Sequence, residues 1–205
     1  MKNMDTAVAT RGRPREFDAD EALAAALRVF WTRGYEGASL TELTEAMGIT
    51  RPSLYACFGN KEALFKKALD LYETEKLAYM QTALDAPTAR GVAERVLRGA
   101  LATQADSHHD PKGCLGVISS VACGAEAEAI KAEVVARRAS SKTAVVERFA
   151  RAKEEGDLPA DTDPEALANY LFALVQGLTL MSGAGTCCRE LGGMVDTALG
   201  MWPGR

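Results

Sequence analysis

The chain has 205 residues, of which 47% are hydrophobic and 6% aromatic, a composition typical of a globular protein built from alanine- and leucine-rich helices. No apolar run reaches the roughly 18 residues of a membrane span, and residues 1–18 contain no apolar signal segment, so we expect a cytoplasmic protein without a membrane partner. The net charge is −4, but residues 1–67 hold 10 basic and 9 acidic side chains against 14 and 19 in residues 68–205.

The charge is therefore +1 in the first part and −5 in the second, with four basic side chains and one acidic among residues 1–15. A basic end on an acidic body is compatible with nucleic-acid binding at that end alone. Residues 1–16 are expected to form an arm without helix, because a glycine and a proline oppose it. Asp18 is placed to cap a first helix to about Arg33, and Gly34 is placed to end it.

A glycine and a proline then separate two short helices. Ser39, with a glutamate three positions later, has the spacing of a capping box, and Gly48 ends this helix. Thr50 is placed to cap the next helix, in which Pro52 occupies the first turn. The pattern predicts a helix-turn-helix, whose second helix offers polar groups to base edges and phosphates at its N-terminal end. An ordinary corner between two helices is the alternative.

The rest of the chain also has helical periodicity and almost no alternation of the kind that strands show. Asn60 is placed to cap a long fourth helix from Lys61 towards Leu84. A further helix is expected over about 88–103, and a short one after a loop at 106–113. The last three are expected over about 126–154, 164–181 and 187–201. The sequence therefore predicts an all-α fold in which a long helix joins an N-terminal helix-turn-helix domain, residues 1–65, to a larger helical domain, residues 66–205.

Cysteine and histidine usage argues against a metal centre. The five cysteines have no regular spacing, so free thiols are expected. His108, His109, Asp110 and Cys114 could supply metal ligands, but adjacent histidines rarely bind one ion and no second cluster supports them. Cys114 and Cys123 leave open a redox- or electrophile-sensing role.

Enzymatic chemistry is not expected either. The chain has only two histidines, side by side, and lacks a nucleophile–base pair, a Walker loop and a dinucleotide-binding fingerprint. We therefore predict neither catalysis nor a cofactor. A helical carrier or interaction protein without specific DNA binding stays open as the alternative to a DNA-binding regulator.

Several motifs together resemble the TetR family of transcriptional regulators. The resemblance is carried by "GRPREFD" and "ALRVFWTRGYEGASLTELTEAMGITRPSLYACFGNKEALF" in the N-terminal part, and more weakly by "GCL" and "DPEALA" further on. Thr44 departs from the alanine that the family usually has, and its hydroxyl is expected to bond back to the preceding turn. The resemblance implies a homodimeric regulator, most simply a repressor that a small-molecule effector releases from a palindromic DNA operator.

The resemblance also implies roles for individual residues. The first residues of the recognition helix, which is the second helix of the helix-turn-helix, would contact bases, and a tyrosine and a lysine would contact phosphates. The start of the helix before it would meet the DNA backbone on the opposite side of the groove. The N-terminal arm would enter the minor groove. Ser39 and Thr50 could equally be caps alone, and the arginines of the arm could stay disordered. The implied DNA-binding residues are Arg13, Arg15, Ser39, Thr41, Thr50, Arg51, Ser53, Tyr55 and Lys61.

The larger domain is expected to bind the effector and to dimerise. Four polar or sulfur-bearing side chains among apolar neighbours suggest a mainly apolar pocket with few polar contacts. These candidates are Gln104, Cys114, Tyr170 and Gln176. Apolar side chains recur at three- and four-residue spacing in the last two helices, so we expect their faces to form the dimer interface. These are Leu167, Leu171, Leu174, Leu178, Leu191, Val195 and Leu199. The alternative is that they complete the core of the monomer.

Overall fold

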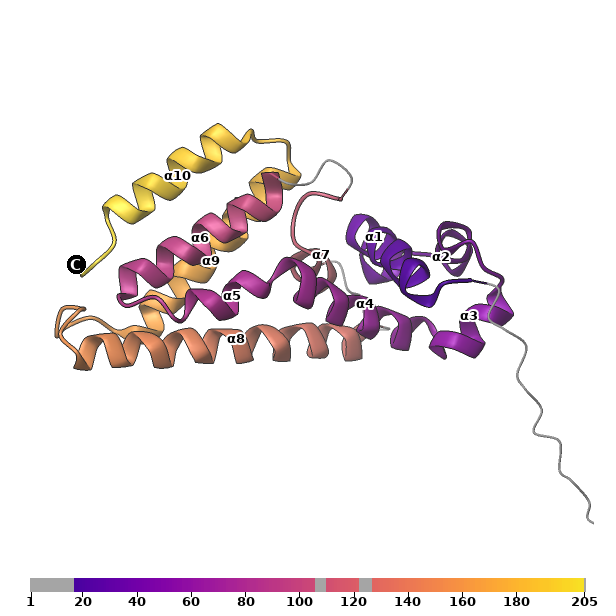
Figure 1. The fold of residues 1–205 in the computed structure, drawn as a ribbon, viewed down its shortest axis with the longest axis horizontal. Coiled ribbons are helices and arrows are strands. Elements are labelled where there is room, and N and C mark those ends of the chain that lie inside the picture. Colours follow the sequence, from indigo (N-terminus) through magenta and orange to yellow (C-terminus); the bar gives the residue numbers. More distant parts are fainter. Residues whose placement is uncertain (1–16, 106–109, 122–126, 205) are drawn as a thin grey trace, which may run out of the picture.

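The computed structural model describes residues 17–105, 110–121 and 127–204, and every regular element in these ranges is a helix. Figure 1 shows a head of short helices at one end and a longer body along which α8 runs. The helices are α1 (Ala19–Gly37), α2 (Leu40–Met47), α3 (Arg51–Phe58), α4 (Lys61–Lys76), α5 (Ala78–Ala83), α6 (Ala89–Ala105), α7 (Leu115–Val121), α8 (Glu128–Glu154), α9 (Pro164–Gly183) and α10 (Cys188–Gly200). The predicted all-α fold is confirmed.

Aromatic rings hold the head together. The Phe30 ring of α1 meets the Phe65 ring of α4 edge-on, with centroids 5.1 Å apart, and Trp31 meets Tyr72 in the same way at 4.8 Å. Each such pair contributes about 0.5–1.5 kcal/mol beyond the burial of its surface. Since α2 also packs on α1 and α3 on α4, the crossed pair α1–α4 is the platform for the two short helices.

The start and the bend of α1 follow from local signals. The Asp18 carboxylate accepts from the backbone N–H of Asp20 at 2.8 Å, which confirms the predicted cap. Gly34 has φ 71° and ψ 177°, a conformation that side chains with a Cβ rarely adopt, so the regular helix stops there as expected and one further turn follows to Gly37. A Cβ at this position would lie 3.4 Å from the Ile118 side chain of α7.

The expected single fourth helix to Leu84 is wrong, because the structure breaks it at Leu77, with φ −111° and ψ 7°. Beyond the break, α5 packs on α6. The Tyr79 ring lies so close to Gly99 of α6 that a Cβ there would be 2.4 Å from the ring. The Thr103 hydroxyl donates to the Gly99 carbonyl of α6 at 3.0 Å and lies 3.4 Å from the Lys76 carbonyl, close to the break. Packing on α6 therefore overrides the helical propensity of the sequence.

The leucine-rich faces of α9 and α10 complete the core of one chain. Leu171, Leu178, Leu191 and Val195 are at most 1% exposed and pack in one cluster with α6 and α8. Leu174 is partly buried against the same cluster. The prediction that these particular side chains face a second subunit is wrong, because α10 packs on α6 and α9 within one chain.

Helix α9 is long and apolar enough, by length and composition alone, to cross a membrane. In this fold it packs against α6, α8 and α10, as the central helix of a helical domain does. This packing buries 33% of the apolar window, while side chains such as Leu180 stay exposed on the outer face of α9.

Head and body share one hydrophobic core at their junction. Leu115 of α7 and Ile130 and Val134 of α8 belong to the same buried cluster as the aromatic rings of the head. The Trp31 indole N–H donates to the carbonyl of Gly113 at 3.2 Å, just before α7. The junction is therefore packed like the interior of a domain, and the head is held against the body by buried contacts.

The contact between Tyr79 and Gly99 generates a stability prediction. Gly99→Ala should lower the free energy of unfolding by about 1–3 kcal/mol, because the added methyl group overpacks the tyrosine ring, although alanine is the better helix former. Chemical denaturation measures the difference. In a Tyr79→Ala background the same substitution should be neutral or stabilising, and an equal loss in both backgrounds would contradict the assigned cause.

Candidate nucleic-acid interface and effector pocket

The first helix of the predicted helix-turn-helix begins with the expected capping box. The Ser39 hydroxyl accepts from the backbone N–H of Glu42 at 3.1 Å, and the Glu42 carboxylate accepts from the Ser39 N–H at 3.0 Å. The Ser39 N–H and the Ser39 hydroxyl, which donates to the same carboxylate at 2.8 Å, lower the pKa of the Glu42 carboxyl. Gly48 ends the helix with φ 64° and ψ 29°, the left-handed conformation that glycine adopts without strain. The Thr44 hydroxyl donates to the Leu40 carbonyl at 2.9 Å, the expected back-bond.

The second helix, α3, presents its polar residues at its exposed N-terminal end. Thr50 caps it by accepting from the Ser53 N–H at 3.3 Å, and the two hydroxyl groups lie 2.9 Å apart. Arg51 extends back to α2 and donates from Nη2 to the Thr41 hydroxyl at 2.8 Å. Tyr55 is 48% exposed. Guanidinium, hydroxyl and phenol groups thus share one surface and can donate to bases or phosphates.

Lys61 stands at the first position of α4, beside the same surface. Its ammonium lies 4.6 Å from the centre of the Tyr35 ring, a cation–π distance. Burial lowers the pKa of this ammonium, while the nearby carboxylates of Glu36 and Glu42 oppose the shift. A cation at a helix N-terminus, beside free backbone N–H groups, is suited to a phosphate oxygen.

A pocket of about 100 Å³ lies where α4 and α5 of the chain meet α7, α8 and α9. Most of its wall is apolar or aromatic, and its charged side chains are Glu73, Arg137 and Arg138. The other lining residues are Leu69, Tyr72, Leu77, Tyr79, Met80, Cys114, Gly116, Val117, Val134, Ser141, Phe172, Val175, Gln176 and Thr179. An apolar cavity with a few polar groups is the usual form of a small-molecule site.

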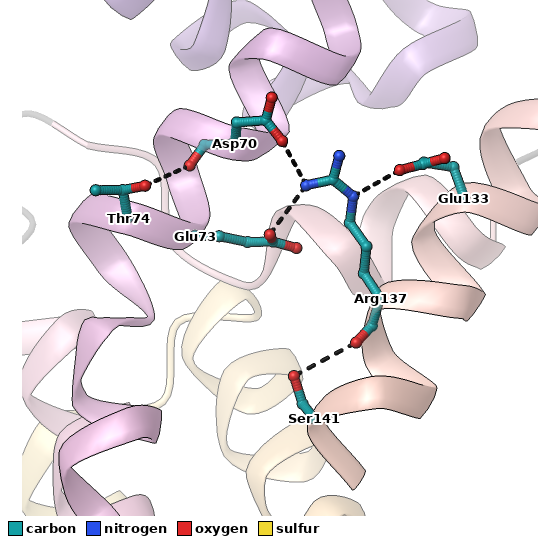
Figure 2. A network of polar contacts seen from close by, with 6 residues as sticks. All are labelled: Asp70, Glu73, Thr74, Glu133, Arg137 and Ser141. Atoms are coloured by element: carbon teal, nitrogen blue, oxygen red, sulfur yellow. Dashed lines mark hydrogen bonds and ion pairs between the residues drawn. The ribbon is translucent and has the colours of Figure 1, made fainter. Parts of the chain in front are cut away.

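Arg137 of α8, one of the lining residues, is bonded to carboxylates of α4 and α8 (Figure 2). Its Nη1 donates to Asp70 at 2.6 Å and to Glu73 at 2.9 Å, and its Nε donates to Glu133 at 2.8 Å. Burial disfavours the charged guanidinium, but the hydrogen bonds that it donates to Asp70, Glu133 and Glu73 outweigh that effect and raise its pKa. Two of the three carboxylates belong to α4, so this arginine ties α4 to α8.

Two tyrosines and a thiol meet in the pocket. Burial raises the pKa of the Tyr72 hydroxyl, and the neighbouring Cys114 raises that pKa further. Burial likewise raises the pKa of Tyr79, again with a contribution from Cys114. Both phenols are therefore neutral hydrogen-bonding groups at physiological pH. They add polarity to the pocket without adding charge.

The "HHDPKGC" segment is only partly described. His108 and His109 lie outside the described residues, as does Cys123, so the thiol-sensing hypothesis stays a prediction. Asp110 is 2.6 Å from the Lys76 ammonium in an ion pair, and Cys114 lines the pocket. Within residues 17–105, 110–121 and 127–204, no three histidine, cysteine or acidic side chains are grouped as metal ligands.

Known proteins match this arrangement over nearly the whole chain. The family model described as "Bacterial regulatory proteins, tetR family" matches residues 22–68, and "Tetracyclin repressor-like, C-terminal domain" matches residues 91–186. The HTH-type transcriptional repressor ComR of Escherichia coli (strain K12) is 30% identical, over 95% of this chain and 93% of ComR. The chain belongs to the TetR family of transcriptional regulators. It is thus a DNA-binding regulator and not an enzyme.

Two further TetR-family proteins extend the comparison. The HTH-type transcriptional repressor AcnR of Corynebacterium efficiens is 28% identical, over 92% of this chain and 94% of AcnR. A structure of the TetR family regulator CifR, a cysteine mutant in complex with 26-base-pair operator DNA, is 43% identical. It covers 94% of this chain and 100% of the CifR chain, with a TM-score of 0.87.

The structure brings most of the expected DNA-contacting residues of this TetR-family protein to one surface and leaves two outside the described residues. Arg51 bonds to Thr41 and Thr50 to Ser53 at this end of the head, and the candidates from Ser39 to Lys61 are all exposed or partly exposed, whereas Arg13 and Arg15 lie outside the described residues. Two of the four effector candidates, Cys114 and Gln176, line the pocket.

The other two effector candidates lie elsewhere. Gln104 binds the backbone of Gly113, accepting from its N–H at 2.8 Å and donating to its carbonyl at 3.3 Å. Tyr170 is exposed and stacks on the Trp202 ring, with centroids 5.9 Å apart. Gln104 therefore fixes the loop before α7, and Tyr170 belongs to the outer face of α9.

Sequence reasoning missed the charged wall of the pocket. Arg137 and Arg138 lie in a long charged helix, where they look like ordinary solvated residues. Tyr72 follows Ala68 and Leu69 at the spacing of a buried helix face, and Tyr79 lies beyond a break that the sequence did not predict. A signal did exist, since Arg137 and Arg138 follow the apolar Val134 by three and four positions and so lie on the same side of a helix as Val134. This spacing does not indicate which helix packs against α8 at the two arginines.

The bond between Thr41 and Arg51 generates a prediction for this TetR-family head. Thr41→Val keeps the shape of the side chain but removes the hydroxyl that orients the guanidinium. Operator binding should weaken by about 0.5–1.5 kcal/mol, the contribution of one hydrogen bond, while thermal stability stays unchanged. Fluorescence anisotropy with labelled operator measures the change. Thr41→Ser should bind as wild type, and a loss equal to that of Thr41→Val would contradict the positioning role.

Proposed function

We propose that the protein is a homodimeric repressor that binds a palindromic operator in the cytoplasm and leaves it when a small molecule occupies the pocket. The observation that carries the proposal is the exposed N-terminal end of α3, where Arg51 is held by Thr41 at 2.8 Å beside Tyr55. The likeness to CifR in its complex with operator DNA supports the same use of this surface.

The DNA contacts divide into two classes under this proposal. Arg51 is the best candidate for reading a base, because a guanidinium can bind the two acceptors of a guanine edge at once. Lys61 and Tyr55 are candidates for phosphate contacts, which position the head without reading sequence. Ser39 and Thr50 already accept backbone hydrogen bonds as caps. The Ser39 hydroxyl also donates to the Glu42 carboxylate at 2.8 Å, so a phosphate contact would have to replace that bond.

Base reading and phosphate contact can be separated by substitution. Arg51→Ala should cost about 1–3 kcal/mol on the operator and leave binding to random duplex nearly unchanged. Tyr55→Phe should weaken binding to both duplexes alike, because a phosphate contact is independent of sequence. Gel shifts at several salt concentrations measure both. Equal losses of Arg51→Ala on operator and random DNA would move Arg51 to the phosphate class, and no binding to either by wild type would overturn the proposal.

A second surface supports the homodimer. With the leucines of α9 committed to the core, its outer face still carries apolar side chains at three- and four-residue spacing. Leu180 is 68% exposed and Met181 40%. The remaining members of this face are Ala166, Tyr170, Ala173 and Ala184. Small and apolar residues in one stripe suit close packing against the same stripe of a second chain.

Charge placed in this stripe should separate the subunits. Leu180→Glu should shift the chain towards monomer in sedimentation velocity, because two carboxylates would be buried at a two-fold contact without partners. Val135→Glu is the matched control, since Val135 is similarly exposed but lies on α8. It should remain a dimer. An unchanged dimer for Leu180→Glu would place the interface elsewhere.

Helix α4 offers the mechanical connection between pocket and DNA. Lys61 begins it at the DNA-facing surface, and Glu73, three turns later, lines the pocket. A small tilt of α4 would move the heads of a dimer relative to grooves that are about 34–36 Å apart. A hundredfold loss of operator affinity requires about 2.7 kcal/mol of coupling, and DNA must then weaken effector binding by the same factor.

A further inference from the structure

The charged side chains of the pocket already have partners. The Arg137 guanidinium donates to Glu73, which lines the pocket with it, and to Asp70 and Glu133, which lie outside the lining. Arg138, the remaining charged residue of the lining, also has an interaction partner. An ion that entered the pocket would lose its hydration without meeting a charge that is free to receive it, and such a transfer is costly. The pocket therefore favours a neutral ligand.

Two neutral polar side chains of the lining are not committed in this way. The backbone carbonyls of Tyr79 on α5 and Gln176 on α9 accept from threonine hydroxyls. The Tyr79 hydroxyl and the Gln176 amide themselves have no hydrogen-bond partner among the described residues. Burial raises the pKa of the Tyr79 hydroxyl, so this phenol stays protonated and can donate. Such a donor gains a hydrogen bond when a ligand brings an acceptor.

The size and the wall of the cavity restrict the ligand further. The volume of about 100 Å³ is smaller than the about 150 Å³ of an engineered apolar cavity that binds benzene. A compact molecule of roughly four to six non-hydrogen atoms therefore matches it. Leu69, Met80, Phe172 and Val175 contribute apolar surface to the wall, so the body of the ligand gains most from being apolar.

We propose that the pocket binds a small neutral molecule with an apolar body and a carbonyl or ether oxygen, and that the Tyr79 hydroxyl donates to this oxygen. The proposal rests on the function proposed above, because it names the chemical class of the effector. The break at Leu77 brings Tyr79 to the pocket, and the contact with Gly99 of α6 confines the ring. The donor is therefore held in place before the ligand arrives, which lowers the entropic cost of binding.

The test uses the full-length chain without DNA and four probes of at most six non-hydrogen atoms: cyclopentanone, cyclopentane, cyclopentylamine and butanoate. Ligand-observed NMR titrations at pH 7, where the amine is a cation and butanoate an anion, measure each dissociation constant. Cyclopentanone should bind about tenfold more tightly than either ion, because only the ions must give up a charged hydration shell.

The role of the hydroxyl is isolated by combining probe and substitution. Tyr79→Phe keeps the ring beside Gly99 and removes only the donor. It should weaken the binding of cyclopentanone about three- to tenfold, the effect of one hydrogen bond, and should not weaken the binding of cyclopentane. A purely structural role of Tyr79 would change both constants alike. Tyr170→Phe, on the outer face of α9 and outside the pocket lining, is the matched control and should bind both probes as wild type.

Gly116→Ala locates the ligand. A Cβ at Gly116 would lie 3.7 Å from Sγ of Cys114 and 3.7 Å from a methyl group of Val134, which are ordinary contacts. All three residues line the pocket, so the added methyl group takes space from a ligand there. The binding of cyclopentanone and of cyclopentane should weaken together, about fourfold for the contact surface of one methylene group. Thermal stability should not fall, because alanine is the better helix former.

Four outcomes would overturn the inference. Either ion could bind as tightly as cyclopentanone, or Tyr79→Phe could bind cyclopentanone as wild type or weaken both uncharged probes equally. Gly116→Ala could bind them unchanged, which would place the ligand elsewhere. Finally, neither cyclopentanone nor any open-chain ketone from butanone to hexan-2-one could bind. Failure of the proposed function has a different signature, since anisotropy would show no operator binding, or the same operator affinity with and without cyclopentanone, while NMR still recorded the ligand.

Discussion

The relative position of head and body depends on the carbonyl of Gly113. This carbonyl accepts from the Trp31 indole at 3.2 Å and from the Gln104 amide at 3.3 Å, so one backbone oxygen joins α1 to α6. The indole is 1% exposed, and neither donor could be left unpaired at that depth without a cost of about 1–3 kcal/mol. Because the shared core continues through Leu115, head and body move together unless this junction rearranges.

A packed junction makes α4 the natural place for a change. On one side it contributes Tyr72 to the rigid aromatic core, and on the other it meets α8 through the bonds of Arg137. The core side is apolar and closely packed, and such contacts have few alternative arrangements. The charged side is partly exposed, so its bonds exchange with water at low net cost. The pocket lies against this exchangeable side, where a ligand can alter the position of α4 without unpacking the head.

The sequence was sufficient wherever the determining contacts are local. Ser39, Gly48, Thr50 and Asn60 act within three or four residues of their own position, so the helix-turn-helix and its boundaries could be predicted residue by residue. The break at Leu77 could not, because it depends on the fit between Tyr79 and Gly99, twenty residues apart in the sequence. Local rules favour one continuous helix there, and only tertiary packing decides against it.

The misassigned leucines of α9 show a second limit of the same kind. Periodicity at three and four residues correctly indicates that the face with Leu171 and Leu178 is buried, but it does not identify the partner. The partner here is the chain's own α6 and α8, which leaves the opposite face with Leu180 for another molecule. Arg137 shows the same limit for a polar residue, since its ion pairs with Asp70 and Glu73 form only because α4 lies opposite it in the fold. Residues that act across helices, and not those that shape one helix, are therefore where a structure adds most to the sequence.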